Sequence, residues 1–124
     1  MSTDILKKYD LVYLASPYTL YSRGPVAAFT EAARIAGALM RRNVRVFSPI
    51  AHGHPLSDYG SVPYFHPEIW KKQDAPFVRA SDALLIATMD GWSVSEGIQH
   101  EIEEFAEAMK PIFYIDPDTL EVEQ

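Results

Sequence analysis

Residues 82–88 read DALLIAT, the most apolar segment of the chain, and predict a strand buried in the centre of a sheet. Two other short apolar runs precede it, LVYLA at 11–15 and VRVFS at 44–48. A fourth run, IFYI at 112–115, follows Pro111 near the end of the chain. All four runs have the length and the β-branched or aromatic content of buried strands.

Stretches with helical spacing separate these strands. Apolar residues recur at intervals of three and four along 25–42, 67–80 and 93–109, and Ser93 with Glu96 has the spacing of a capping box at the start of the last stretch. The order β-α-β-loop-α-β-α-β predicts one α/β domain over residues 1–124. We expect a flavodoxin-like or Rossmann-like three-layer α/β/α fold with a mostly parallel sheet of four to five strands. Ligands of such sheets bind where the strand order reverses, at the carboxyl ends of the strands.

Composition excludes several function classes. The chain has 124 residues and no cysteine, which excludes disulfides, thiolate metal sites and a cysteine nucleophile. It contains no apolar run of roughly 20 residues and its first residues lack the apolar core of a secretory signal, so we expect a cytoplasmic protein without a membrane partner. From Asp90 onward Lys110 is the single base among ten acids, which argues against a nucleic acid polymer as partner.

The segment AHGHPLSDYGSVPYFH, residues 51–66, has neither helical nor strand periodicity. We expect a long loop that helps to form a binding surface at the ligand end of the sheet. His52 and His54, next to Asp58, leave a metal-dependent hydrolase open as an alternative, although a metal site requires three or four ligands of suitable geometry. Hydrogen bonding within the loop is the other interpretation, and the prediction made here includes neither a metal nor a cofactor.

The last helical stretch carries a candidate catalytic carboxylate. Its expected core stripe consists of Ile98, Ile102, Phe105 and Met109, and Glu101 lies beside that stripe, one turn after Gly97. A ligand can approach closely at the bare glycine, and the helix N-terminus favours an ionised carboxylate, as a nucleophile requires. Membership of a solvated acidic face is the competing interpretation of Glu101.

Three short motifs occur in a characteristic order. They are YLASPY at 13–18, an aspartate eight residues before Asp82, and S-x-G-x-x-x-E at 95–101. This arrangement resembles the nucleoside 2-deoxyribosyltransferase superfamily, including its 2′-deoxynucleoside 5′-monophosphate N-hydrolases. Within that superfamily the chain is similar to a small uncharacterised group with the signatures SPYT, SPIxHGH and DGWxxSxG, which begin here at Ser16, Ser48 and Asp90.

The resemblance implies an enzyme that cleaves an N-glycosidic bond. Glu101 would be the nucleophile that attacks the anomeric carbon, Asp74 would protonate the leaving base, and Tyr18 would orient the nucleophile or the sugar. Ser95 and the amides that open its helix would hold a 5′-phosphate or a 5′-hydroxyl. The full set of expected substrate-binding residues is Ser16, Pro17, His52, His54, Asp90, Trp92, Ser95 and Gly97.

The substrate implied is a nucleoside or nucleotide, and the assembly implied is a homo-oligomer. The chain departs from the pattern D-S-G-T-x-x-E of the transferases, because Glu96 occupies the expected sugar-binding turn. Transfer to a second base and hydrolysis by water are both open. A non-catalytic nucleotide-binding or sensing module is the main alternative.

Overall fold

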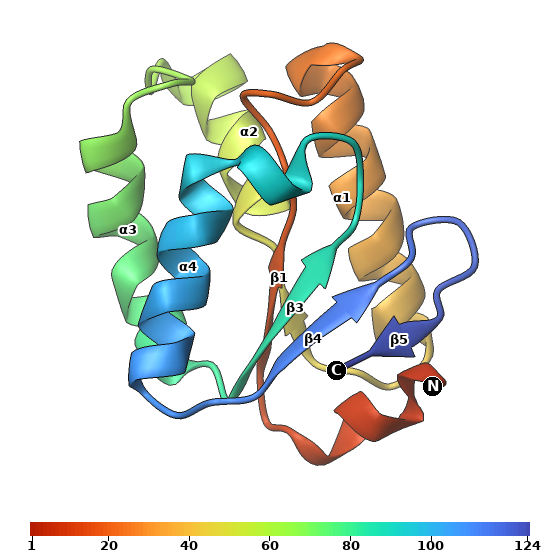
Figure 1. Cartoon of the computed structure of the whole chain (residues 1–124). Helices are drawn as coiled ribbons and strands as arrows, with labels where there is room; N and C mark the ends of the chain where they lie inside the picture. Colours follow the sequence, from red (N-terminus) through yellow and green to blue (C-terminus); the bar gives the residue numbers. More distant parts are fainter.

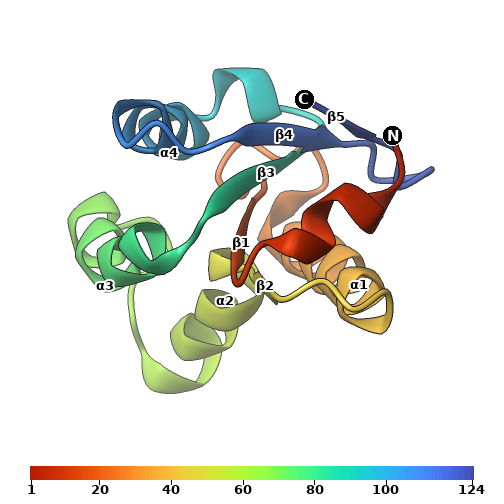
Figure 2. The same cartoon turned by 90° about the horizontal axis from the view of Figure 1, so that it is seen from below.

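A five-stranded sheet runs through the middle of the structure, with helices on both faces (Figure 1; Figure 2). The structure is a computed structural model and describes all of residues 1–124. The strand order is β2-β1-β3-β4-β5, in which the first four strands are parallel and β5 is antiparallel to β4. The strands are β1 (Val12–Ala15), β2 (Val46–Phe47), β3 (Ala83–Ala87), β4 (Ile112–Ile115) and β5 (Val122–Glu123). The predicted three-layer α/β/α fold is therefore confirmed.

The helices divide between the two faces of the sheet, and Figure 2 shows the three layers along the strands. Helix α1 (Gly24–Arg41) and the short 3-10 helix η1 (Thr3–Lys8) cover one face, while α3 (Pro67–Ala80) and α4 (Glu96–Glu107) cover the other. Helix α2 (Pro49–Gly60) follows the edge strand β2 and packs against α1, and the 3-10 turn η2 (Trp92–Val94) precedes α4. None of these helices has both the length and the apolar character needed to cross a membrane.

Alternation along the strands produces two hydrophobic cores. In β1, Val12 and Leu14 pack with α1, whereas Tyr13 and Ala15 pack with α3 and α4. Every residue of β3 is buried, since it lies between β1 and β4 with helices over both faces. This is why DALLIAT is apolar at successive positions rather than at alternate ones.

The expected loop at 51–66 is wrong for its first ten residues, which belong to α2. The Ser48 side chain accepts a hydrogen bond from the amide of Ala51 at 3.0 Å, and Pro49 occupies the first turn, where a missing N–H costs nothing. The helix continues through Pro55 to Gly60, and the C-cap residue Ser61 adopts a left-handed φ of 61°. Its buried residues include Gly53, His54 and Ser57, so packing rather than intrinsic helix propensity stabilises it.

Two details of the last helix also differ from expectation. Ser95, not Ser93, is the N-cap, because the Ser95 hydroxyl accepts from the amide of Ile98 at 3.3 Å. The helix ends at Glu107, and Met109 adopts a left-handed φ of 57° with its side chain 91% exposed. Met109 is therefore outside the core stripe that its spacing predicted.

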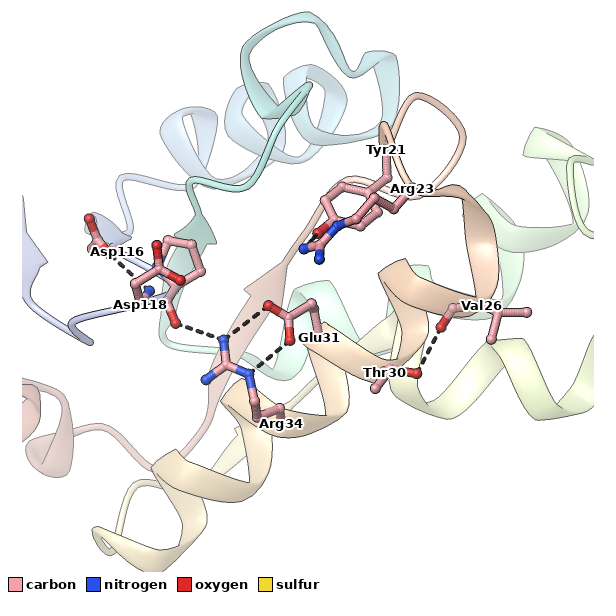
Figure 3. A network of polar contacts seen from close by, with 9 residues as sticks. Tyr21, Arg23, Val26, Thr30, Glu31, Arg34, Asp116 and Asp118 are labelled. Atoms are coloured by element: carbon pink, nitrogen blue, oxygen red, sulfur yellow. Dashed lines mark hydrogen bonds and ion pairs between the residues drawn. The ribbon is translucent and has the colours of Figure 1, made fainter.

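The acidic C-terminal segment forms β5 and is held to the rest of the domain by polar contacts. The Arg34 guanidinium donates to the carboxylate of Glu31 and, at 2.7 Å, to the carbonyl of Pro117 (Figure 3). The N-terminal ammonium donates to the carbonyl of Val122 at 2.7 Å, so the two termini are adjacent. The Arg34 contacts come from α1, which covers the opposite face of the sheet from α3 and α4.

Candidate active site

A cavity of about 550 Å³ lies where the strand order reverses, at the carboxyl ends of β1 and β3. Its walls come from the segment after β1, from α2 and the turn that follows it, from α3, and from the start of α4. This is the place that ligands occupy in open α/β sheets. The volume is within the range of small-molecule sites.

Two carboxyl groups on neighbouring helices face this cavity. Asp74 lies on α3 and Glu101 on α4. Burial raises the pKa of Asp74 to about 6, and burial of the Glu101 carboxyl, with a further contribution from the charge of Asp74, raises its pKa to about 8. Burial of the Glu101 carboxyl thus acts against the ionised form that the helix N-terminus was expected to favour. Between about pH 6 and 8 the pair therefore holds one proton.

Tyr13 contributes a buried hydroxyl next to Glu101. It extends from β1 into the cavity, and its ring is fully buried against Phe47 and Phe105. Burial and the Glu101 charge raise the pKa of Tyr13 far above its ordinary value, while the Tyr13 hydroxyl in turn lowers the pKa of Glu101. Tyr13 is therefore the tyrosine next to Glu101, whereas the Tyr18 hydroxyl lies against His54.

Three buried side-chain oxygens have no hydrogen-bond partner of good geometry within the chain, and all three belong to residues that line this cavity. They are the hydroxyls of Tyr13, Ser16 and Ser57. A buried hydroxyl without a partner costs free energy, on the order of 1–3 kcal/mol. Tyr13 lies next to Glu101, and water or a polar ligand in the cavity can pair with the hydroxyls of Ser16 and Ser57.

His54 connects three segments of the cavity wall. Its Nδ1 lies 2.6 Å from the Tyr18 hydroxyl, and its Nε2 lies 3.1 Å from a carboxylate oxygen of Asp58. The other oxygen of Asp58 accepts from the Tyr64 hydroxyl. The His54 ring is buried and stacks on Phe29 with ring centroids 4.7 Å apart.

Trp70 forms a flat apolar part of the wall. Its indole N–H donates to the carbonyl of Pro63 at 2.9 Å, which holds the ring in place. The ring lies so close to Gly53 that a Cβ built there would be 2.9 Å from a Trp70 ring carbon. Trp70 and Asp74 are one turn apart on α3, so an aromatic surface and a carboxyl group lie on the same side of the cavity.

Most of the predicted site residues line the cavity. Seven do so, namely Ser16, Tyr18, His54, Asp74, Ser95, Gly97 and Glu101. Four do not, namely Pro17, His52, Asp90 and Trp92.

The four residues outside the cavity have other neighbours. His52 is exposed and its ring lies beside Phe47 and Phe77, since two residues along a helix are about 200° apart. Trp92 packs edge-on against Tyr114, and Asp90 accepts a hydrogen bond from Ser22 at the surface. Pro17 is buried in the segment that follows β1.

The structure does not bring together the side chains that the metal-dependent alternative requires, because His52 and His54 lie on different sides of α2. His52 and His54 point to different surroundings, and both nitrogens of His54 already face protein groups. No group of three or more His, Cys, Asp or Glu side chains in the chain is arranged to hold a metal ion.

Comparison with known families gives one match that covers most of the chain. The sequence model described as "Domain of unknown function (DUF1937)" matches residues 10–116. The chain belongs to the DUF1937 family. The matched part of this DUF1937 domain extends from the residues before β1 to the end of β4 and includes every cavity residue named above. No curated protein matches the chain.

Sequence reasoning did not single out two residues that line the cavity of this DUF1937 domain, Tyr13 and Ser57. Tyr13 looks like an ordinary strand residue, and only its polar hydroxyl at a fully buried position sets it apart. Ser57 was assigned to a loop, although it is one helical turn from both Gly53 and His54 on the same helix.

Proposed function

We propose that this domain cleaves the N-glycosidic bond of a nucleoside-type substrate in the cavity between α2, α3 and α4. One observation carries the proposal: two carboxyl groups of different, raised pKa, Asp74 and Glu101, face the same cavity from neighbouring helices. Pairs of titratable groups whose environments separate their pKa values are typical of acid and base or nucleophile assignments. The order of motifs shared with the nucleoside 2-deoxyribosyltransferase superfamily supports the same chemistry.

The proposed reaction uses the single proton that the two carboxyl groups hold near neutral pH. Ionised Glu101 attacks the anomeric carbon while the bond from that carbon to the base nitrogen breaks. The bonding electrons pass to the base nitrogen, which takes the proton from Asp74. Water or a second base then attacks the glycosyl carbon and releases Glu101, and Asp74 accepts the proton of the incoming group.

The surroundings of Glu101 support its ionised form once substrate binds. The Tyr13 hydroxyl lowers the pKa of Glu101, and positive charge that develops on the sugar in the transition state acts in the same direction. The single proton of the pair then resides on Asp74, whose burial also favours its protonated form. The flat face of Trp70 on the same helix offers a surface on which a base can stack.

The test is release of free base from a panel of nucleosides and 5′-monophosphates, with and without an acceptor base, followed by chromatography. Glu101→Gln should lower the rate at least about a hundredfold, because glutamine has the same shape but is a poor nucleophile. Glu103→Gln is the matched control, since Glu103 lies on the same helix and is exposed. Equal rates for Glu101→Gln and the wild type would refute the assignment.

A non-catalytic nucleotide-binding or sensing module is the second candidate. The observation that favours it is the burial of the Glu101 carboxyl, which raises its pKa to about 8 and so disfavours the ionised form that a nucleophile needs at pH 7. This function predicts that a panel member raises the melting temperature without any release of base. The two functions are therefore separated by the same panel when binding and product formation are both measured.

A further inference from the structure

The wall of the cavity formed by α2 contains a hydrogen-bonded chain from Asp58 through His54 to Tyr18. The three residues come from two segments, since Asp58 and His54 lie one turn apart on α2 and Tyr18 follows β1. Neither carboxyl group of the proposed reaction takes part in this chain. Tyr18 and His54 line the cavity and His54 is buried, so this hydrogen-bonded chain is in a position to affect a bound ligand.

The direction of the hydrogen bonds follows from Asp58. A carboxylate only accepts hydrogen bonds, so the His54 nitrogen facing it, Nε2 at 3.1 Å, carries the hydrogen. In the neutral ring Nδ1 is then an acceptor, and it receives the Tyr18 hydroxyl hydrogen across 2.6 Å. The Tyr18 hydrogen is thus directed at His54, and the remaining lone pairs of the Tyr18 oxygen are available to the cavity.

Tyr18 keeps its own proton under ordinary conditions. Burial and the neighbouring Tyr64 and Asp58 raise the pKa of Tyr18 to about 12. A neutral hydroxyl with its hydrogen already engaged acts as a hydrogen-bond acceptor. The group of a ligand that meets Tyr18 must therefore be a donor.

Ser57 provides a second polar group on the same wall. It lies one turn after His54 on α2 and is buried, and its hydroxyl has no partner of good geometry in the protein. A serine hydroxyl both donates and accepts, so it can pair with a ligand hydroxyl that donates to Tyr18. Two such groups that line one cavity match an alcohol better than an apolar group.

The charges around the cavity disfavour an anion at this wall. Lys71 is the only lysine or arginine that lines the cavity, whereas four acidic side chains line it, Asp74, Glu96, Glu101 and Glu104. Asp58 adds a carboxylate behind His54. A phosphate would meet mainly negative charge here, whereas an uncharged hydroxyl would not.

We infer that Tyr18 and Ser57 form a subsite that binds one hydroxyl group of the sugar. His54 and Asp58 are positioning residues that orient the Tyr18 hydroxyl. The identity of the ligand as a nucleoside rests on the proposed function. The subsite itself rests on the hydrogen-bonded chain, the unpaired Ser57 hydroxyl and the charge of the cavity.

Binding is measured by calorimetry on the full chain carrying Glu101→Gln, which prevents turnover. The probes are adenosine and uridine, each with its 2′-deoxy, 3′-deoxy and 5′-deoxy analogues. Tyr18→Phe keeps the ring and removes only the hydroxyl, and we expect it to weaken binding of the parent nucleoside about tenfold. For one deoxy analogue, the one that lacks the hydroxyl read by Tyr18, the same change should leave the affinity within a factor of about two.

Asp58→Asn tests the positioning role. The asparagine oxygen can still accept from Tyr64, while its NH₂ group faces His54 and donates to Nε2, which moves the ring hydrogen to Nδ1. His54 then donates to Tyr18, and the Tyr18 hydroxyl becomes a donor toward the cavity. We expect the same selective weakening, about tenfold for the parent and little for that analogue, with the melting temperature close to that of the wild type.

Tyr59→Phe is the matched control, because Tyr59 follows Asp58 on the same helix and is 91% exposed. It should leave all affinities unchanged. Equal weakening of every probe by Tyr18→Phe, no weakening of any, or no binding of either nucleoside series would overturn the subsite.

Base release by the chain with Glu101 intact separates the subsite from the proposed function. Selective weakening without base release by the wild type would support the subsite and refute cleavage. Base release by the wild type with no selective weakening would support cleavage and refute the subsite.

Discussion

Replacing Glu101 by glutamine should make the stability of this domain much less sensitive to pH. The Glu101 carboxyl has an ordinary pKa of 4.5 in the unfolded chain and a pKa of about 8 in the folded one, mainly because it is buried. Between these values the folded state holds a proton that the unfolded state has released. Stability therefore falls as the pH rises from about 4.5 to about 8, and it does not fall further above that range.

The size of the effect follows from linkage. Each pH unit between the two pKa values costs the folded state about 1.4 kcal/mol, so the full interval amounts to about 5 kcal/mol. Asp74 adds a smaller decrease between its ordinary 3.8 and about 6. Glu101→Gln removes the larger part, so the variant should match the wild type at pH 4 and exceed its free energy of unfolding by several kcal/mol at pH 9.

The assay is urea denaturation at one-unit steps from pH 4 to pH 9 for the wild type, Glu101→Gln and the control Glu103→Gln. Glu103 is exposed on the same helix, so its replacement should leave the pH dependence of the wild type unchanged. The reasoning would be refuted if wild type and Glu101→Gln showed parallel curves, or if the wild type gained stability between pH 6 and pH 8.

Three other predictions concern packing, capping and rate. Gly53→Ala should lower the free energy of unfolding, measured by urea denaturation, by about 1–3 kcal/mol, because the new methyl group would lie 2.9 Å from a ring carbon of Trp70. Gly37→Ala is the control: its methyl group would make an ordinary 3.6 Å contact with Arg41, so it should raise the free energy of unfolding by up to about 1 kcal/mol. Ser95→Ala should cost about 1 kcal/mol through the lost N-cap while Ser93→Ala costs little, and equal losses in the same assay would contradict the cap assignment. If cleavage occurs as proposed, the rate of base release should peak between about pH 6 and pH 8 and fall on both sides, and a rate that rises steadily to pH 9 would exclude the shared proton.

The four parallel strands and three of the four helices could be predicted because their signals are local, whereas the short strand Val122–Glu123 was not predicted. The fourth strand appears in the structure at the predicted residues, Ile112–Ile115, and the central one lies within the predicted 82–88. Helix α2 could not be predicted in this way, because its sequence contains glycine and proline and its buried face is defined by contacts with α1 and the cavity. Such tertiary contacts leave no periodic pattern in the sequence, so a helix that depends on them cannot be predicted from periodicity.

The candidate site, like the fold, could be predicted only in part. Asp74 and Glu101 were placed on helices from spacing and resemblance, and the structure brings both to one cavity. The raised pKa of Glu101 could not be anticipated, since it depends on how much water the surrounding helices exclude. His52 was expected beside His54, but the helix turns the two side chains in different directions.

The sequence alone determined the α/β class, the order of the elements and the two helices that carry the carboxyl groups, because apolar periodicity and capping act over a few residues. Only the tertiary structure decided which polar groups meet at the switch point of the sheet. Tyr13, Ser57 and the chain from Asp58 to Tyr18 come from segments far apart in sequence, and their burial, pairing and proton affinity arise when those segments pack around one cavity.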